Sequence, residues 1–205
     1  MTNGKIRYIS GLDLGQAAEF TALAVLEQTT EPDPDRPNQK VKHYALRHLE
    51  RFALGTPFPA VCRRLDALFC EPPLAQSVLV VDQTGVGEPV VRLLRRAHLK
   101  ASIRPLTITP GNLAHIDETG MWSVPKKDLV SNLQVLLQSR RLKVAPRLPE
   151  SQTLVRELLS YRVKATLSPK DTLEAWREGP HDDLVLAVAI AAWQSEQLRD
   201  FWVWC

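Results

Sequence analysis

Three strand-like segments follow one another at the start of this sequence, before any segment with helical spacing appears. They are Ile6 to Leu14, Thr21 to Glu27 and Val41 to Phe52, and each is apolar or alternates apolar with polar residues as strands do. Between the last two, Glu31 to Asn38 is rich in proline and acids, which excludes regular structure and predicts an exposed loop. Because consecutive strands with short connections pair antiparallel, we predict a three-stranded antiparallel meander.

Strands and helices alternate in the middle of the chain. Helical spacing marks Phe58 to Phe69, Val90 to Leu99 and Lys127 to Arg140, while Ser77 to Asp82 and Ile103 to Ile108 have the apolar pattern of buried strands. Helices that connect strands of one sheet make those strands parallel. The order predicts a single α/β domain over residues 1–205, a mixed sheet in which parallel strands follow the meander and helices flank both faces.

The last quarter of the chain predicts a mixture of elements. It contains a short helix at Thr153 to Leu159, a hairpin made of Tyr161 to Leu167 and Leu173 to Trp176, and a long helix from Asp182 to Leu198. The long helix begins with residues that are apolar nearly all round, so we expect it to be buried. Its N-terminus would then point two adjacent acids, together with His181, out of the core.

Acidic residues stand at three ends of these buried segments. Asp13 ends the first strand, Asp82 follows four apolar strand residues, and Asp182 with Asp183 starts the last helix. Their plain alternative role is to cap turns and a helix end. Carboxylates brought together at a sheet edge repel, however, unless cations bind between them, and oxygen ligands favour hard ions such as Mg²⁺ or Mn²⁺. The pattern predicts a metal-dependent enzyme acting on phosphate esters.

Glycines follow Asp82 in the stretch Gln83-Thr84-Gly85-Val86-Gly87. They let the backbone approach a ligand closely, and they open a helix whose N-terminus attracts anions. The carboxyl end of such a strand is where α/β sheets bind ligands. We therefore expect Asp82 to be the firmest member of the acidic group.

Positive charge is concentrated in the middle of the sequence. From Arg92 to Arg147 there are eleven Lys or Arg and three Asp or Glu, whereas the remainder holds fifteen basic and twenty acidic residues. A basic segment beside an acidic cluster is what an enzyme of the phosphate backbone needs. Arg95 and Arg96 are candidate DNA contacts, with solvated helix ends as the open alternative.

The compartment follows from cysteine use and hydropathy. Three cysteines without a Cys-x-x-Cys spacing fit a reduced cytoplasm, where thiols are small core residues. No signal peptide opens the sequence, and the longest apolar run, Leu184 to Trp193, is shorter than a membrane helix needs. We predict a soluble cytoplasmic protein with no membrane partner, in the host cell if a phage or prophage encodes it.

Four short motifs together resemble the nuclease domain of phage terminase large subunits, over nearly the whole chain from about Ile6 to Trp193. In chain order the motifs are Gly11-Leu12-Asp13-Leu14-Gly15, Val81-Asp82-Gln83-Thr84-Gly85-Val86-Gly87, Val124-Pro125-Lys126-Lys127-Asp128-Leu129 and His181-Asp182-Asp183-Leu184. That family has a ribonuclease-H-like fold, shared with Holliday-junction resolvases and retroviral integrases. The resemblance therefore implies the same mixed sheet that the segment order predicts.

The resemblance also implies an activity, a two-metal endonuclease that cuts concatemeric viral double-stranded DNA during genome packaging. Asp13 would bridge two Mg²⁺ or Mn²⁺ ions and Asp82 would bind one of them. Asp183 would bind the other, with Asp182 as the alternative or a helper.

Supporting roles are implied for four further residues. Thr84 and His181 would lie outside the ligands themselves, as groups that support them. Lys126 and Lys127 would contact the DNA backbone, unless they are ordinary surface lysines.

One departure from the family concerns the packaging motor. Terminase large subunits carry an N-terminal ATPase, and no Gly-x-x-x-x-Gly-Lys-[Ser/Thr] loop occurs here. We expect either an excised domain or a short free-standing protein that cannot translocate DNA alone. Its partners in a phage context would be an ATPase motor domain, the portal or the small terminase subunit.

Three other functions remain open at this stage. A Holliday-junction resolvase would share the chemistry and differ in its DNA substrate. A catalytically inactive DNA-binding or assembly module would bind DNA without cutting it. The Gly11 to Gly15 turn also occurs in actin-like and sugar-kinase-like phosphotransferases, which need two ribonuclease-H-like halves.

Overall fold

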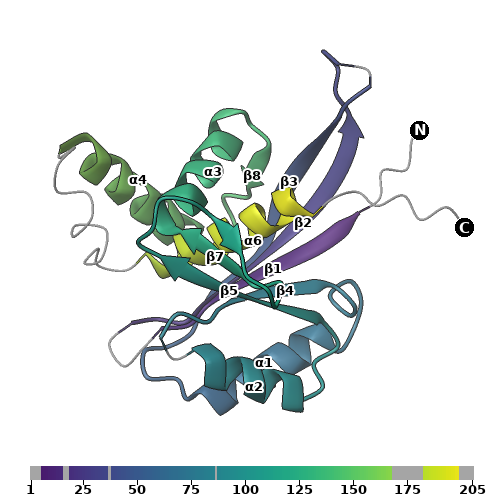
Figure 1. Ribbon diagram of the computed structural model, residues 1–205, viewed down its shortest axis with the longest axis vertical. Helices are drawn as coiled ribbons and strands as arrows, with labels where there is room; N and C mark the ends of the chain where they lie inside the picture. The colour runs from purple at the N-terminus through teal and green to yellow at the C-terminus, as the bar shows by residue number, and fades with distance from the viewer. Residues whose placement is uncertain (1–5, 16–18, 37, 86, 168–181, 199–205) are drawn as a thin grey trace, which may run out of the picture.

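The computed structural model describes residues 6–15, 19–36, 38–85, 87–167 and 182–198. In this part of the chain a single eight-stranded sheet has the order β6-β7-β5-β4-β1-β2-β3-β8, and helices cover both of its faces (Figure 1). The strands are β1 (Arg7–Asp13), β2 (Ala22–Pro32), β3 (Lys40–Arg51), β4 (Val78–Asp82), β5 (Ser102–Thr109), β6 (His115–Ile116), β7 (Trp122–Pro125) and β8 (Leu142–Val144). The helices are α1 (Phe58–Phe69), α2 (Gly87–Arg96), α3 (Lys126–Gln138), α4 (Ser151–Leu167) and α6 (Asp183–Gln197).

The direction of the strands confirms the predicted fold class. β1, β2 and β3 form the antiparallel meander, and β4 joins the other side of β1 in parallel. β5 and β7 continue the sheet in parallel on that side, while β8 is parallel to β3 at the opposite edge. This mixed sheet, an antiparallel meander continued by parallel strands, is the one that the segment order predicted.

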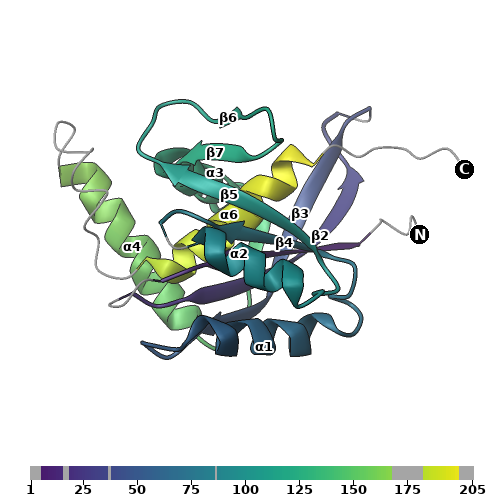
Figure 2. The ribbon, with the colours of Figure 1, turned by 60° about the horizontal axis from the view of Figure 1, so that its bottom comes forward.

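Two hydrophobic cores lie on opposite faces of the sheet. Alternate residues of β1 and β4 divide between them: Ile9 and Val80 face α3, α4 and α6, whereas Leu12 and Val81 face α1 and α2. Figure 2, in which this face comes forward, shows α2 in front of the sheet and α1 below it. The period of two in each strand therefore determines which helix layer a side chain meets.

Helix α6 crosses the centre of its face and is buried from Asp183 to Ser195. It packs on β1 at Gly11, where an added Cβ would lie 2.0 Å from the carbonyl oxygen of Ala187 and 2.8 Å from Ile190. Only a residue without a side chain permits this close approach. Gly11 therefore sets the distance between the central helix and the central strand. Among the described residues, no helix is both long and apolar enough to cross a membrane.

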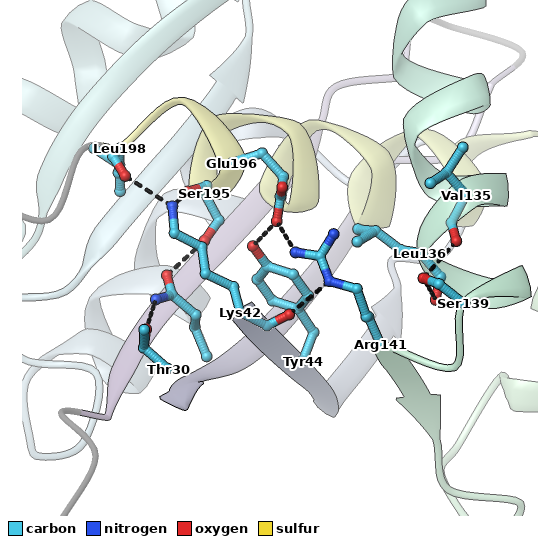
Figure 3. A network of polar contacts seen from close by, with 11 residues as sticks. Thr30, Lys42, Tyr44, Val135, Leu136, Ser139, Arg141, Ser195, Glu196 and Leu198 are labelled. Carbon is cyan, nitrogen blue, oxygen red and sulfur yellow. Dashed lines mark hydrogen bonds and ion pairs between the residues drawn. The ribbon is translucent and has the colours of Figure 1, made fainter. Parts of the chain in front are cut away.

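The C-terminal end of α6 is anchored to β2 and β3 by a polar network (Figure 3). Lys42 Nζ donates to the carbonyl oxygens of Ser195, at 2.6 Å, and Leu198, at 2.8 Å. Glu196 accepts from the hydroxyl of Tyr44 and from the guanidinium of Arg141. A cation on the last carbonyl groups satisfies acceptors that a helix end leaves without partners.

The structure differs from the sequence predictions mainly in the last third. The predicted hairpin is wrong at Tyr161 to Leu167, because α4 continues through those residues as a helix of 17 residues. Its other strand, Leu173 to Trp176, lies outside the described residues. Strands β6, β7 and β8 were not predicted, since they are only two to four residues long and carry too little pattern.

Candidate active site

Asp13 and Asp82 are the last residues of two neighbouring parallel strands. Leu12 of β1 is in register with Val81 of β4. The next residues, Asp13 and Asp82, therefore lie side by side at the carboxyl ends of the two strands, and this end of the sheet is called the sheet edge below. Asp13 lies two residues beyond Gly11, and Asp82 two beyond Val80, so both side chains are on the face covered by α6. Each aspartate is only 8 % exposed.

Helix α6 brings two further carboxylates to that edge. Asp183 is its first residue and is buried, and Asp182 is the N-cap residue. Asp182 makes no side-chain capping hydrogen bond to the helix. The Asp182 carboxylate therefore does not perform the capping role that acids usually take at a helix start.

Asp82, Asp183 and Asp182 lie near enough to Asp13 for their charges to act on its carboxylate. Burial raises the pKa of Asp13 well above its usual value, and the charges of Asp82, Asp183 and Asp182 raise it further. Burial also raises the pKa of Asp82, against hydrogen bonds that stabilise its ionised form. A group whose charged form is destabilised in this way is characteristic of functional sites.

Thr84 holds Asp82 in place. Asp82 Oδ1 accepts hydrogen bonds from the backbone N–H of Thr84, at 2.8 Å, and from its hydroxyl, at 2.5 Å. The same hydroxyl oxygen accepts from the N–H of Ile108 on β5, at 2.8 Å. Thr84 thus links the carboxylate to the next strand, and its supporting role at a metal site stays a prediction.

Two glycines allow the turn after Asp82 to close. Gly85 has a φ of 69°, a conformation that other residues adopt at a cost. A Cβ at Gly87 would lie 2.6 Å from the carbonyl oxygen of Asp82. Helix α2 consequently starts directly against the end of β4, as the glycine pattern predicted.

Lys126 brings a positive charge to the cluster. It follows β7, which runs parallel to β5 and β4, so it reaches the same sheet edge as the aspartates. Its Nζ lies 2.6 Å from Asp182 Oδ2, and its charge lowers the pKa of both Asp13 and Asp82. Lys126 is therefore a neighbour of the acidic group, and its contact with the DNA backbone stays a prediction.

Tyr161 of α4 contacts the same carboxylate as Lys126. Its hydroxyl donates to Asp182 Oδ2, and the ammonium of Lys126 lies 5.9 Å from the centre of its ring. Burial, followed by the charge of Asp182, raises the pKa of Tyr161, so the phenol stays protonated and remains a donor.

A buried ion pair lies behind Asp183. Arg51, the last residue of β3, donates to Glu157 of α4, and its guanidinium lies 3.9 Å from Asp183 Oδ2. Glu157 in turn accepts from the backbone N–H of Val185 in the first turn of α6, at 3.1 Å. Burial raises the pKa of Glu157 to about 7, with the charges of Asp183 and Asp182 adding to the effect.

The donor chemistry of the cluster fits a divalent cation. Asp13, Asp82, Asp182 and Asp183 offer only oxygen, the ligand that Mg²⁺ and Mn²⁺ prefer, and the ionised form of Asp13 needs a nearby positive charge. Within the described residues, no three His, Cys, Asp or Glu side chains stand as a group that could hold a metal ion. Metal binding would therefore require these carboxylates to rearrange, and it would compete with the ammonium of Lys126 for them.

The remaining predicted site residues do not join the cluster. Lys127 is exposed and its ammonium binds Asn112 Oδ1 at 2.8 Å. Arg95 and Arg96 are exposed in the last turn of α2, about 12 Å along the helix from its start beside Asp82. His181 lies outside the described residues.

Sequence reasoning missed Arg51, Glu157 and Tyr161. Glu157 carried a weak signal, an acid among the apolar residues of a predicted helix. Arg51 and Tyr161 carried none, because only the pairing of β3 and the continuation of α4 bring them to this edge.

Comparison with known proteins gives a distant structural likeness and no likeness in sequence. No known protein family and no curated protein matches the sequence. A structure of RuvC from Thermus thermophilus aligns over 90 % of both chains, with 13 % identity and a TM-score of 0.40. A second structure, T. thermophilus RuvC in complex with a Holliday junction substrate, aligns over 91 % of both chains, with 13 % identity and a TM-score of 0.39. At this similarity the likeness carries no weight for activity.

Proposed function

We propose that this protein is a metal-dependent endonuclease that hydrolyses phosphodiester bonds of double-stranded DNA. The observation that carries the proposal is the convergence of Asp13, Asp82 and Asp183, with Asp182 beside them, from three distant parts of the chain at one sheet edge. A protein gains no stability from placing like charges together in a buried position, since their repulsion costs free energy. A function that uses the negative charge accounts for the arrangement.

The residues of the site have three expected roles: metal binding, orientation of a ligand and contact with a phosphate. Asp13, Asp82 and Asp183 would hold a pair of Mg²⁺ or Mn²⁺ ions, with Asp182 as the alternative ligand. Such a pair, when bound, would lower the pKa of an attacking water and stabilise the leaving oxygen. Thr84 keeps the Asp82 carboxylate oriented, and Lys126 offers an ammonium that can pair with a phosphate oxygen at the same edge.

The basic middle segment, Arg92 to Arg147, would bind the DNA backbone. Lys127, Arg95 and Arg96 are exposed and lie outside the acidic cluster, so they would contact phosphates at some distance from the cut. Contacts of this kind give affinity that falls with salt and carries no base information. We expect weak binding without sequence preference.

Within this class we favour a terminase-type nuclease that cuts concatemeric viral DNA and acts with a packaging ATPase, a portal and a small subunit. The support is the order of the four motifs in the sequence, including the Val124-Pro125-Lys126 approach to the cluster. A junction resolvase would use the same acids and would differ in substrate. The two are separated by comparing a four-way junction with linear duplex of the same sequence.

The central experiment is incubation of supercoiled plasmid with Mn²⁺, Mg²⁺ or EDTA. Wild type should nick and linearise the plasmid with either metal and do nothing in EDTA. Asp82→Asn should be inactive, whereas Asp66→Asn, which removes an exposed carboxylate from α1 on the opposite face, should cut like wild type. Equal cutting by Asp82→Asn and wild type would refute the site, and metal-independent DNA binding without cutting would favour an inactive module.

A further inference from the structure

The row of residues that crosses the sheet at the active edge does not end at Asp13. Asp13 pairs with Ala22 of β2, and Ala22 pairs with Arg51 of β3, so the three residues lie side by side on the face of α6. Residues directly opposite each other in neighbouring strands project their side chains to the same face. The register therefore brings a guanidinium to the acidic cluster from the side away from Asp82.

Arg51 is fixed by what surrounds it. Its guanidinium lies over the ring of Phe20, 4.8 Å from the ring centre, and donates to Glu157. Its side chain is 14 % exposed and that of Glu157 is 6 % exposed, so the ion pair is largely removed from water. A planar guanidinium held on two sides has little freedom to turn, which makes it a precise partner for a carboxylate.

Glu157 caps the N-terminus of α6 by accepting a hydrogen bond from a backbone N–H of its first turn. The first N–H groups of a helix have no partners within the helix, and the usual N-cap residue, here Asp182, makes no capping bond with its side chain. Glu157 supplies an acceptor instead, from α4, to the N–H of Val185 (α4 lies against this part of α6 in Figure 2). Because Glu157 accepts from this N–H, the Asp182 carboxylate is not needed for that bond.

We propose that Arg51 and Glu157 form a positioning pair that fixes the first turn of α6, so that Asp183 is presented to Asp13 as a metal ligand. The inference rests on the proposed function and deepens it. Glu157 holds the helix end through Val185, and Arg51 connects Glu157 to Asp183 while offsetting their negative charges. Neither residue is a ligand or touches the substrate; both act through Asp183.

The test is Mn²⁺ affinity measured by calorimetry, together with KM and kcat for plasmid cutting. Glu157→Gln and Arg51→Lys should each weaken Mn²⁺ binding about 10- to 100-fold, as loss of a group that orients a metal ligand does. kcat at moderate Mn²⁺ should fall while KM for DNA stays near wild type. Arg51→Lys keeps the charge and a long side chain, so it tests the pair even if Glu157→Gln folds poorly.

Matched controls come from the other face of the same strand. Glu50 precedes Arg51 in β3 and forms an ion pair with Arg64 of α1, at 3.0 Å. Glu50→Gln and Arg64→Lys make the same chemical changes away from the cluster, and both should leave Mn²⁺ affinity unchanged.

A double-mutant comparison separates positioning from general stability. In an Asp183→Asn background, Glu157→Gln should cause no further loss of Mn²⁺ affinity, because the residue through which it acts is gone. Full additivity of the two losses would overturn the inference, as would wild-type Mn²⁺ affinity in both single variants. If wild type neither binds Mn²⁺ nor cuts DNA, both the proposed function and this inference are wrong. If wild type does both and the variants behave like wild type, only the positioning role of Arg51 and Glu157 is wrong.

Discussion

Asp13 and Asp82 end neighbouring parallel strands on the same face of the sheet, and each is almost fully buried beside the other's charge. The buried charges that would bind metal therefore lower the stability of the metal-free protein. Lys126 offsets part of the free energy that the fold loses by ionising Asp13, and a bound cation would offset more.

Asp13→Asn should therefore stabilise the metal-free protein while it abolishes cutting. We expect a gain of about 1–2 kcal/mol in the free energy of unfolding at pH 7.5 in EDTA, because one buried charge and its repulsion disappear. Plasmid cutting should fall about 100- to 1,000-fold or more. Denaturant melts check the first effect, with Asp66→Asn as the control that should change neither quantity; a less stable Asp13→Asn would mean that the cluster is not under electrostatic strain.

Lys126→Met should have the opposite effect on the metal-free protein. The four acids lose their nearest cation, so the free energy of unfolding in EDTA should fall by about 1–3 kcal/mol. Mn²⁺ no longer competes with the ammonium, and the rise of Tm with Mn²⁺ should exceed that of wild type. Lys127→Met is the neighbouring control, since Lys127 is exposed and bound to Asn112; an equal response of the two variants would remove Lys126 from the cluster.

Thr84→Val should change the pH dependence of cutting. The hydroxyl that it removes stabilises the ionised Asp82 carboxylate and so lowers its pKa. Without that bond the pKa of Asp82 rises, and the acid limb of the pH–rate profile should move to higher pH. Thr119→Val removes the same kind of bond, from Thr119 to Asp117 Oδ1 at 2.6 Å, in an exposed loop; its profile should match that of wild type.

The first strand, the fourth strand and the last helix could be predicted from the sequence because each is long and strongly apolar. Asp13 and Asp82 could be placed with them, since the acid at the end of a buried strand is fixed by the strand itself. Their common face followed from the period of two, once both strands were in one sheet.

Lys126, Arg51 and Glu157 could not be placed in the same way. Lys126 reaches the cluster because β7, only four residues long, runs parallel to β5. Arg51 reaches it through a register that contains a shift between Val25 and Leu26, and one residue of slip would turn it to the other face. Glu157 depends on the packing of α4 against α6, which no local pattern encodes.

Gly11→Ala should destabilise the protein far more than its small volume suggests. The new Cβ would meet the carbonyl oxygen of Ala187 at 2.0 Å, so α6 must move away from β1 and carry Asp183 with it. We expect a loss of about 2–4 kcal/mol. In Gly111→Ala the nearest atom would lie at 3.4 Å, an ordinary contact, and its Tm should stay within a degree or two of wild type.

Glu157 gives the metal-free protein a stability that falls as pH rises. Its pKa is about 7 in the folded protein, raised from 4.5 by burial first and then by the neighbouring aspartates. The folded state thus holds the proton more tightly than the unfolded state, so the contribution is fully present below pH 4.5 and is lost as pH rises through about 7. The raised pKa of Asp13 acts in the same direction. Between pH 5 and pH 8 in EDTA the free energy of unfolding should drop by about 1–3 kcal/mol.

Glu157→Gln cannot ionise, so its stability should vary less over that interval, as denaturant melts at four pH values would reveal. Glu50→Gln is the control of opposite sign. Burial alone would raise the pKa of Glu50, but its bonds to Arg64 and His48 bring that pKa below the usual value, so removing it should leave the loss toward pH 8 in place. A wild type that is equally stable at pH 5 and pH 8, or a Glu157→Gln variant with the full wild-type slope, would show that Glu157 does not carry this proton.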